Sequence, residues 1–120
     1  MTEEATSAAT ATVPTGHASR YLQQLCKHWQ HNLAVEFTPD RGTVVFPRDV
    51  RGADWPGDAR VTFDATAAAL TVRIDASSAE HLEALKEVVA RHLDRFAFRE
   101  APLAFDWRAP EDQGFRPNRA

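Results

Sequence analysis

Cysteine is nearly absent from this chain of 120 residues, which contains Cys26 and no other. A single cysteine excludes an intramolecular disulfide and, within one chain, a zinc site built from several thiolates. No apolar run approaches the roughly 20 residues of a membrane-spanning helix, and residues 1–16 lack the basic start and apolar centre of a secretory signal. We therefore expect a reduced, cytoplasmic protein without a membrane partner.

Lysine is also scarce, because Lys27 and Lys86 are the only two, so arginine carries nearly all of the positive charge. The formal net charge of -3 argues against a nucleic-acid partner. The sequence has no glycine-rich phosphate loop, metalloprotease motif or nucleophile elbow. An enzyme is therefore not the first expectation.

The distribution of apolar residues divides the chain into three parts. Residues 1–18 are mostly Ala, Thr, Ser, Gly and Glu, without apolar periodicity, and are expected to form a flexible tail. Residues 109–120, with two prolines and Phe115, are expected to form a second, loose tail. Residues 19–108 are left as a single folded domain.

Two segments have the apolar spacing of amphipathic helices. The first is predicted over residues 20–32, with Ser19 as N-cap. The second is predicted over residues 77–98, where Ser77 and Glu80 have the spacing of a capping box. The apolar stripes are Leu22, Leu25, Cys26, Trp29 and Leu33 in the first helix, and Leu82, Leu85, Val89, Leu93 and Phe96 in the second.

The remaining apolar segments alternate with period two, which predicts half-buried antiparallel strands. They are AVEFT from Ala34, TVVFP from Thr43, RVTFD from Arg60, LTVRID from Leu70 and LAFDWR from Leu103. We therefore predict an α+β fold, a two-layer sandwich in which two helices cover one face of a sheet of about five strands, in the order α-β-β-β-β-α-β. The opposite face is expected to be polar, with Glu36, Thr62, Asp64, Thr71, Arg73, Asp106 and Arg108.

The segment CKHWQH, from Cys26 to His31, raises the question of a metal or redox site. On a helix, Cys26 and His28 point about 200° apart, so they cannot hold one ion, and Cys26 is expected in the core. His28 and His31 lie about 60° apart, on a flank shared with Tyr21. They could share a metal if His17 or a partner chain supplied a third ligand, and otherwise form a solvated shoulder.

The second helix has its own polar candidates. His81 and His92 lie at the margin of the apolar stripe, where a buried, hydrogen-bonded histidine is the commoner outcome. If the two helices lie side by side, His28 and His92 could approach each other. Arg95 and Arg99 could form surface ion pairs with neighbouring carboxylates or could hold an anionic ligand.

Two segments together resemble a known bacterial family. The segment YLQQLCKHW, from Tyr21, and the segment HLDRFAFRE, from His92, are similar to the small domains catalogued as domain of unknown function 2218, and the resemblance covers residues 18–108. That family has no assigned activity, so the resemblance implies no catalytic residues. It implies an association with siderophore-interacting flavoproteins, which reduce ferric chelates.

These observations leave three functional hypotheses. The first is a non-enzymatic binding or accessory module in iron–siderophore handling, with His28, His92, Arg95, Arg99 and Tyr21 as candidate ligand-binding residues. Its ligand would be iron or a ferric chelate, and its partner a siderophore-interacting flavin reductase. The second is an interaction domain that forms a homodimer through the polar sheet face. Trp55 and Phe115 motivate this hypothesis, because they are apolar residues that the predicted core does not use. The third is a small enzyme that uses His92 or Cys26.

Overall fold

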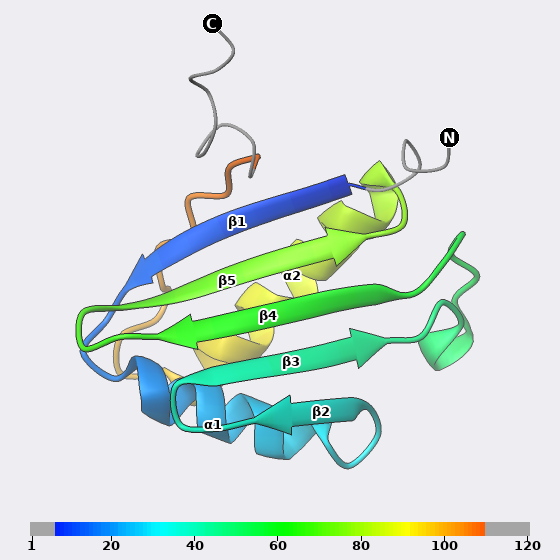
Figure 1. The fold of residues 1–120 in the computed structure, drawn as a ribbon. Coiled ribbons are helices and arrows are strands. Elements are labelled where there is room, and N and C mark those ends of the chain that lie inside the picture. Colours follow the sequence, from blue (N-terminus) through cyan, green and yellow to red (C-terminus); the bar gives the residue numbers. More distant parts are fainter. Residues whose placement is uncertain (1–6, 110–120) are drawn as a thin grey trace, which may run out of the picture.

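The computed structural model describes residues 7–109 and shows one antiparallel sheet of five strands in the order β1-β5-β4-β3-β2, with two helices (Figure 1). Four strands that follow one another along the chain form a meander, and β1 adds at its β5 edge. The elements are β1 (Ser7–Pro14), α1 (Ala18–Trp29), β2 (Ala34–Phe37), β3 (Arg41–Phe46), a short 3-10 turn (Val50–Gly52), β4 (Ala59–Ala65), β5 (Ala69–Ala76) and α2 (Ala79–Phe96).

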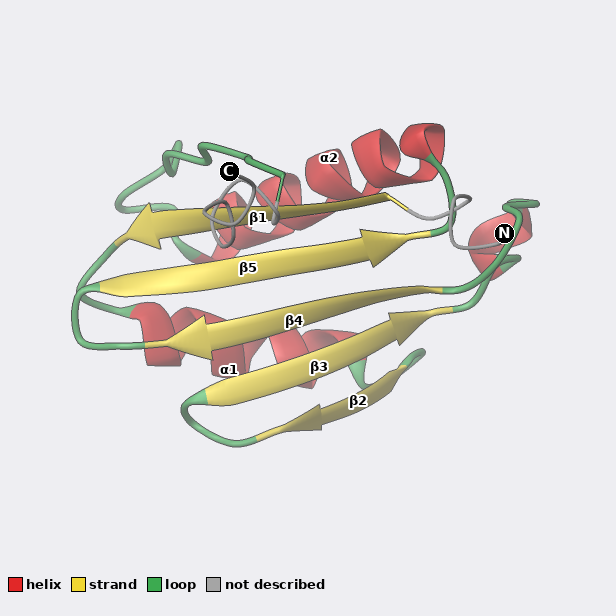
Figure 2. Ribbon diagram, turned by 45° about the horizontal axis from the view of Figure 1, so that its top comes forward, coloured by secondary structure: helices red, strands yellow, loops and turns green. Residues whose placement is uncertain are grey.

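Both helices lie on the same face of the sheet, and the opposite face is left open (Figure 2). Contacts join α1 to β3 and to α2, and α2 to β5 and β1. This arrangement confirms the predicted two-layer α+β class, because the apolar stripe of each helix is buried against the apolar face of the sheet. None of the helices in the described part of the chain is long and apolar enough to cross a bilayer.

The core follows the predicted stripes. Leu22, Leu25 and Trp29 of α1 are buried against the sheet. The sheet contributes Val44, Phe46, Val61, Phe63, Leu70, Val72 and Ile74, and α2 contributes Leu82, Leu85, Val89 and Leu93. The alternation of side chains in β4 and β5 and the helical period of α1 and α2 therefore place the same residues inward that the sequence pattern indicated.

The main difference from the predicted fold is the strand at the β5 edge of the sheet. The expectation of a flexible tail is wrong for residues 7–14, which form β1 and pair with β5 from Ser7↔Ala76 to Pro14↔Ala69. Alternate residues Ala9, Ala11 and Val13 are buried, and the ladder with β5 supplies the stabilisation that their weak hydrophobicity does not. Residues 1–6 lie outside the described residues, as do residues 110–120 of the predicted C-terminal tail.

The predicted strand at residues 103–108 is therefore not the edge of the sheet. It is not a strand, and it touches β1 through one bridge, in which Thr10 and Arg108 exchange two backbone hydrogen bonds of 2.8 Å. Leu103 is buried as expected, whereas Phe105 and Trp107 are half-buried and stack on each other with ring centroids 5.6 Å apart. Because β1 already occupies the place beside β5, this segment runs back along α2, from Asp94, which accepts the Leu103 backbone N–H, to Lys86, whose Nζ is 6.0 Å from the ring of Trp107, and then reaches β1.

Both predicted helix caps are displaced. Helix α1 begins at Ala18 rather than Arg20, with His17 as an N-cap that makes no side-chain bond, and the Ser19 hydroxyl donates to the Pro39 carbonyl at 2.6 Å. Helix α2 is capped by Ser78 rather than Ser77, because the Ser78 hydroxyl accepts the His81 backbone N–H at 3.0 Å. The first helix also ends at Trp29, three residues before the predicted Asn32.

Candidate functional site

One flank of α1 faces α2 along its length. Tyr21 and His28 are separated by two helical turns and therefore share this flank. Near the start of α1, Tyr21 contacts Glu100, which follows the end of α2. Near the end of α1, His28 contacts His92 and Phe96 of α2. The two helices therefore run side by side in opposite directions, as the hypothesis of a His28–His92 approach required.

The ring centroids of His28 and His92 lie 5.7 Å apart, so the predicted approach is found. Phe96 packs edge-on against His28 at 5.8 Å, and Trp29 lies beneath His92 at 5.2 Å. Two imidazoles that ligate one ion through nitrogens about 2.1 Å from the metal have their ring centres at a comparable separation. His28 is exposed and His92 is half-buried, so solvent reaches the pair.

His92 is held in one orientation by the backbone of its own helix. Its Nδ1 donates a hydrogen bond to the Val88 carbonyl at 2.8 Å, which leaves Nε2 with a free lone pair. A ligating histidine commonly fixes its second ring nitrogen in this way. Burial lowers the pKa of His92, the hydrogen bond to the Val88 carbonyl raises it, and the neighbouring His28, Arg91 and Arg95 lower it further. The ring is therefore neutral near pH 7.

Two arginines of α2 lie near His92. Arg91 and Arg95 are exposed and close enough to His92 to act on its pKa. We call His28, Arg91, His92, Arg95 and Phe96 the helix seam. The predicted Arg99 lies beyond the seam, where its guanidinium is 5.5 Å from the ring of Phe98.

Tyr21 belongs to a second cluster rather than to the histidine pair. Its hydroxyl donates a short hydrogen bond to Oε2 of Glu100, which also accepts the Thr15 hydroxyl at 3.1 Å. Burial and then the bond to Glu100 raise the pKa of Tyr21, and the same bond lowers the pKa of Glu100. Tyr21 thus ties α1 to the turn after α2, and Glu100 is a partner that the sequence pattern did not identify.

The predicted metal pair of His28 and His31 spans the end of α1. Because α1 ends at Trp29, His28 lies on the helix and His31 lies in the exposed turn that follows it. Among residues 7–109 there is no group of three His, Cys, Asp or Glu side chains that could hold a metal ion. The described residues alone therefore do not complete a metal site at the seam.

Cys26 occupies the core position that its place in the apolar stripe predicted. The side chain is fully buried, and burial raises the pKa of the thiol to about 11. A protonated, inaccessible thiol is a poor nucleophile and a poor metal ligand. The enzyme hypothesis therefore receives no support from Cys26.

Two surface hollows lie away from the seam. One, of about 390 Å³, is on the open sheet face and is lined by Val45, Asp58, Ala59, Arg60, Asp75 and Ala76. The other, of about 370 Å³, lies by the start of α1 and includes Gly16, His17, Ser19 and Arg20. Neither of these two hollows is lined by His28 or His92.

A further histidine, His81, packs against the loop that carries Trp55, for which the sequence pattern predicted no helix or strand. Trp55 stacks on His81 with ring centroids 4.5 Å apart and planes 7° apart. His81 is 1% exposed, and its Nδ1 lies 2.7 Å from the Ser77 hydroxyl and accepts the Ser77 backbone N–H at 3.2 Å. Burial lowers its pKa. This histidine matches the expectation of a buried, hydrogen-bonded side chain, and Trp55 is not a surplus apolar residue.

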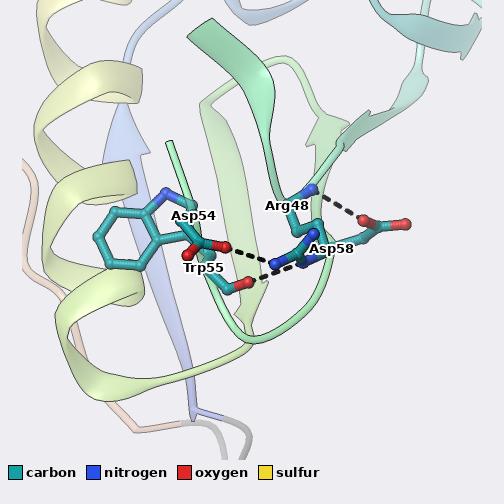
Figure 3. Close-up of polar contacts among 4 residues, drawn as sticks. All are labelled: Arg48, Asp54, Trp55 and Asp58. Carbon is teal, nitrogen blue, oxygen red and sulfur yellow. Dashed lines mark hydrogen bonds and ion pairs between the residues drawn. The ribbon is translucent and has the colours of Figure 1, made fainter. Parts of the chain in front are cut away.

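Arg48 holds the loop that carries Trp55 (Figure 3). Its backbone N–H donates to Asp58 at 2.8 Å, and its side chain donates to the Trp55 carbonyl at 3.0 Å and pairs with Asp54. These contacts fold residues 48–58 back on themselves and direct the indole toward α2 (Figure 3). The only sequence signal for this contact was a tryptophan in a polar, glycine-containing loop.

Comparisons with known proteins agree with this architecture. Residues 10–108 match the model of a family described as uncharacterised proteins conserved in bacteria, DUF2218. The NMR structure of PA4090 from Pseudomonas aeruginosa is 30% identical, with a TM-score of 0.65 over 85% of this chain and 95% of that chain. No functionally curated protein matches the sequence. This chain therefore belongs to the bacterial family of domain of unknown function 2218, as the two segments around Cys26 and Phe96 had indicated.

Proposed function

We propose that this protein is a non-enzymatic accessory module that binds an anionic ferric chelate at the helix seam, as part of iron–siderophore handling in the cytoplasm. The carrying observation is the pair of His28 and His92, contributed by two different helices, with ring centroids 5.7 Å apart. The association of the family with siderophore-interacting flavoproteins, which the resemblance implies, points in the same direction. A flavin reductase of that kind would then be the partner.

The charges at the seam favour an anion over a bare metal ion. Within residues 7–109, neither Arg91 nor Arg95 forms an ion pair or hydrogen bond, whereas pairs such as Arg41–Asp64 and Arg73–Asp75 form on the open sheet face. Unpaired guanidinium groups repel a free cation, but they bind carboxylate or catecholate oxygens well. A ferric complex has a net negative charge when the negative charge of its ligands exceeds the positive charge of the ferric ion. The arginines can then attract the complex.

The histidines add a contact that depends on the metal. The free Nε2 of His92 and the exposed ring of His28 can fill a coordination position that the chelator leaves open, since neutral imidazole is a common ligand of iron. The lowered pKa of His92 keeps this ring unprotonated near neutral pH. The chelator supplies the remaining ligands, which the protein itself lacks among residues 7–109.

Titration calorimetry and absorbance with ferric citrate, a ferric bis-catecholate, a neutral ferric tris-hydroxamate and zinc ion alone test this proposal. We expect the anionic ferric complexes to bind more tightly than the neutral complex or zinc. His28→Ala and His92→Ala should weaken binding roughly 10-fold or more. Arg95→Gln should weaken the binding of the anionic ligands only.

The matched control is His31→Ala, which removes an exposed histidine outside the pair and should leave binding unchanged. The proposal is wrong if no ferric complex binds, or if the His28→Ala and His92→Ala variants bind as well as the native protein. Equal loss in the His31→Ala variant would show that binding depends on general surface charge.

The two other hypotheses have less support from the described residues. The open sheet face could carry a homodimer, but its charges are already used within the chain by the Arg41–Asp64 and Arg73–Asp75 pairs. An enzyme based on His92 would need a nucleophile or acid near Nε2, and within residues 7–109 the ring contacts of His92 are with His28 and Trp29. A binding module remains the function that the geometry supports best.

A further inference from the structure

Helix α2 has its charges sorted along its outer face. The exposed residues of its first half are acidic, at Glu80, Glu83 and Glu87, and those of its second half are basic, at Arg91 and Arg95. Spacings of three and four residues place all five on one side of the helix. Figure 2 shows that α2 lies on the sheet with its other side away from the strands. This face therefore carries a negative half and a positive half along one line.

Most of these charged side chains have no ion-pair partner among the described residues. Glu83 pairs with Lys86 at 2.8 Å. Within residues 7–109, Glu80, Glu87, Arg91 and Arg95 form no ion pair. The order of Glu87 before Arg91 at a spacing of four suits an intrahelical pair, yet the two side chains are not joined. Four free charges on one face are thus available to a partner.

We propose that two copies of this chain associate through this face, with their α2 helices antiparallel about a two-fold axis near residue 89. In that arrangement, Glu87 lies opposite the partner's Arg91, and Glu83 lies opposite the partner's Arg95. The interface is isologous, since each pair occurs twice by symmetry. This proposal goes beyond the chelate-binding function, and it uses a face of α2 that shares Arg91 and Arg95 with the helix seam, rather than the open sheet.

The order of the charges along this face favours a second copy of the chain over other partners. A parallel pair of α2 helices would place charges of the same sign opposite each other. In the antiparallel pair, the acidic half of each helix lies opposite the basic half of the other. An anionic membrane or a uniformly acidic protein would be attracted by Arg91 and Arg95 but repelled by Glu80 and Glu87. A second copy meets both signs in the required order.

The apolar part of this face is small. Ala84 and Val88 are half-buried between the charged residues. Phe98, 69% exposed and the one large apolar side chain that is exposed among residues 7–109, follows the end of α2. Exposed ion pairs contribute little each and are screened by salt. The dimer is therefore expected to be weak and sensitive to ionic strength.

Sedimentation equilibrium of the full chain, at about 50 mM and about 500 mM salt, tests the proposal because the Debye length falls severalfold over this range. We expect a monomer–dimer equilibrium that weakens at high salt. Glu87→Arg and Arg91→Glu should each weaken dimerisation roughly 5-fold or more, because each change introduces two repulsive contacts across the two-fold axis. The double variant with both changes should restore dimerisation to within about 2-fold of the native protein, because the two charges are then exchanged.

Arg60→Glu is the matched control, since it makes the same charge change at an exposed residue of β4 on the open sheet face, and it should leave dimerisation unchanged. A native protein that stays monomeric at low salt would overturn the proposal. So would a double variant that dimerises no better than the single variants, or an Arg60→Glu variant that is equally impaired. Glu87 lies outside the helix seam, so the Glu87→Arg variant separates a failure of dimerisation from a failure of chelate binding.

Discussion

Gly42 lies where β3 passes over α1, directly above Cys26. A Cβ atom at this position would lie 2.8 Å from Sγ of Cys26 and 3.3 Å from Cβ of Phe37. Both neighbours are side chains of the packed layer between helix and sheet, so neither can yield freely. The closeness of β3 to α1 therefore depends on a residue without a side chain.

Gly42→Ala is expected to lower the free energy of unfolding by about 1–3 kcal/mol, as for overpacking of a full core. Cys26→Ala should relieve the contact, so the double variant should lose less stability than the sum of the two single variants. Urea unfolding measures both effects. The control is Gly16→Ala, because a Cβ at Gly16 has no neighbour within 4 Å. Strict additivity of the two changes would contradict this account.

The seam residues show how far single positions could be predicted. The approach of His28 to His92 followed from the helical spacing of each residue and from the assumption that the helices are neighbours, and it is found. Tyr21 shares the flank of His28 but bonds to Glu100, which lies beyond the end of α2. The partner of Tyr21 could not be predicted, because it depends on how the chain turns after Phe96.

At the scale of elements, β1 shows what a weak sequence pattern can hide. Ala and Thr alternate over residues 9–12 of β1, which is a period of two with little contrast in hydrophobicity. The small side chains of Ala9 and Ala11 fit under α2, with which β1 is in contact. The strand forms because β5 offers a free edge, so tertiary pairing outweighs the local preference.

Ala11→Asp is expected to lower the free energy of unfolding by roughly 3 kcal/mol or more, because it places a carboxylate in the core where Ala11 is 1% exposed. Thr12→Asp is the matched control, since Thr12 is the exposed neighbour on the same strand, and it should change stability much less. Urea unfolding compares the two. Similar, near-native stability of both variants would mean that residues 7–14 do not form part of the folded sheet.

For the molecule as a whole, two histidines make stability depend on pH. Burial lowers the pKa of His81 and of His92 in the folded state below the ordinary value of 6.5. The unfolded chain then binds more protons than the folded chain as the pH falls through 6.5. The contribution of both rings to stability is therefore complete above that pH and is lost progressively toward the folded-state pKa values.

The free energy of unfolding, measured with urea between about pH 5 and pH 7, should decrease as the pH falls. His81→Asn keeps an acceptor for the Ser77 backbone N–H but removes the titrating ring, so its stability should vary less with pH than that of the native protein. His31→Asn changes an exposed histidine and should reproduce the native pH dependence. An unchanged pH dependence in the His81→Asn variant would show that His81 does not contribute.

The sequence by itself determined the two helices, the four-stranded meander, the apolar stripes and the α+β class, because these follow from periodicity within one segment. It also placed His28 and His92 on flanks that could meet. Only the tertiary structure decided that β1 rather than residues 103–108 completes the sheet, that Tyr21 turns to Glu100, and that Trp55 covers His81. Each of these joins residues more than twenty positions apart, and such contacts depend on the packing of whole elements rather than on local preference.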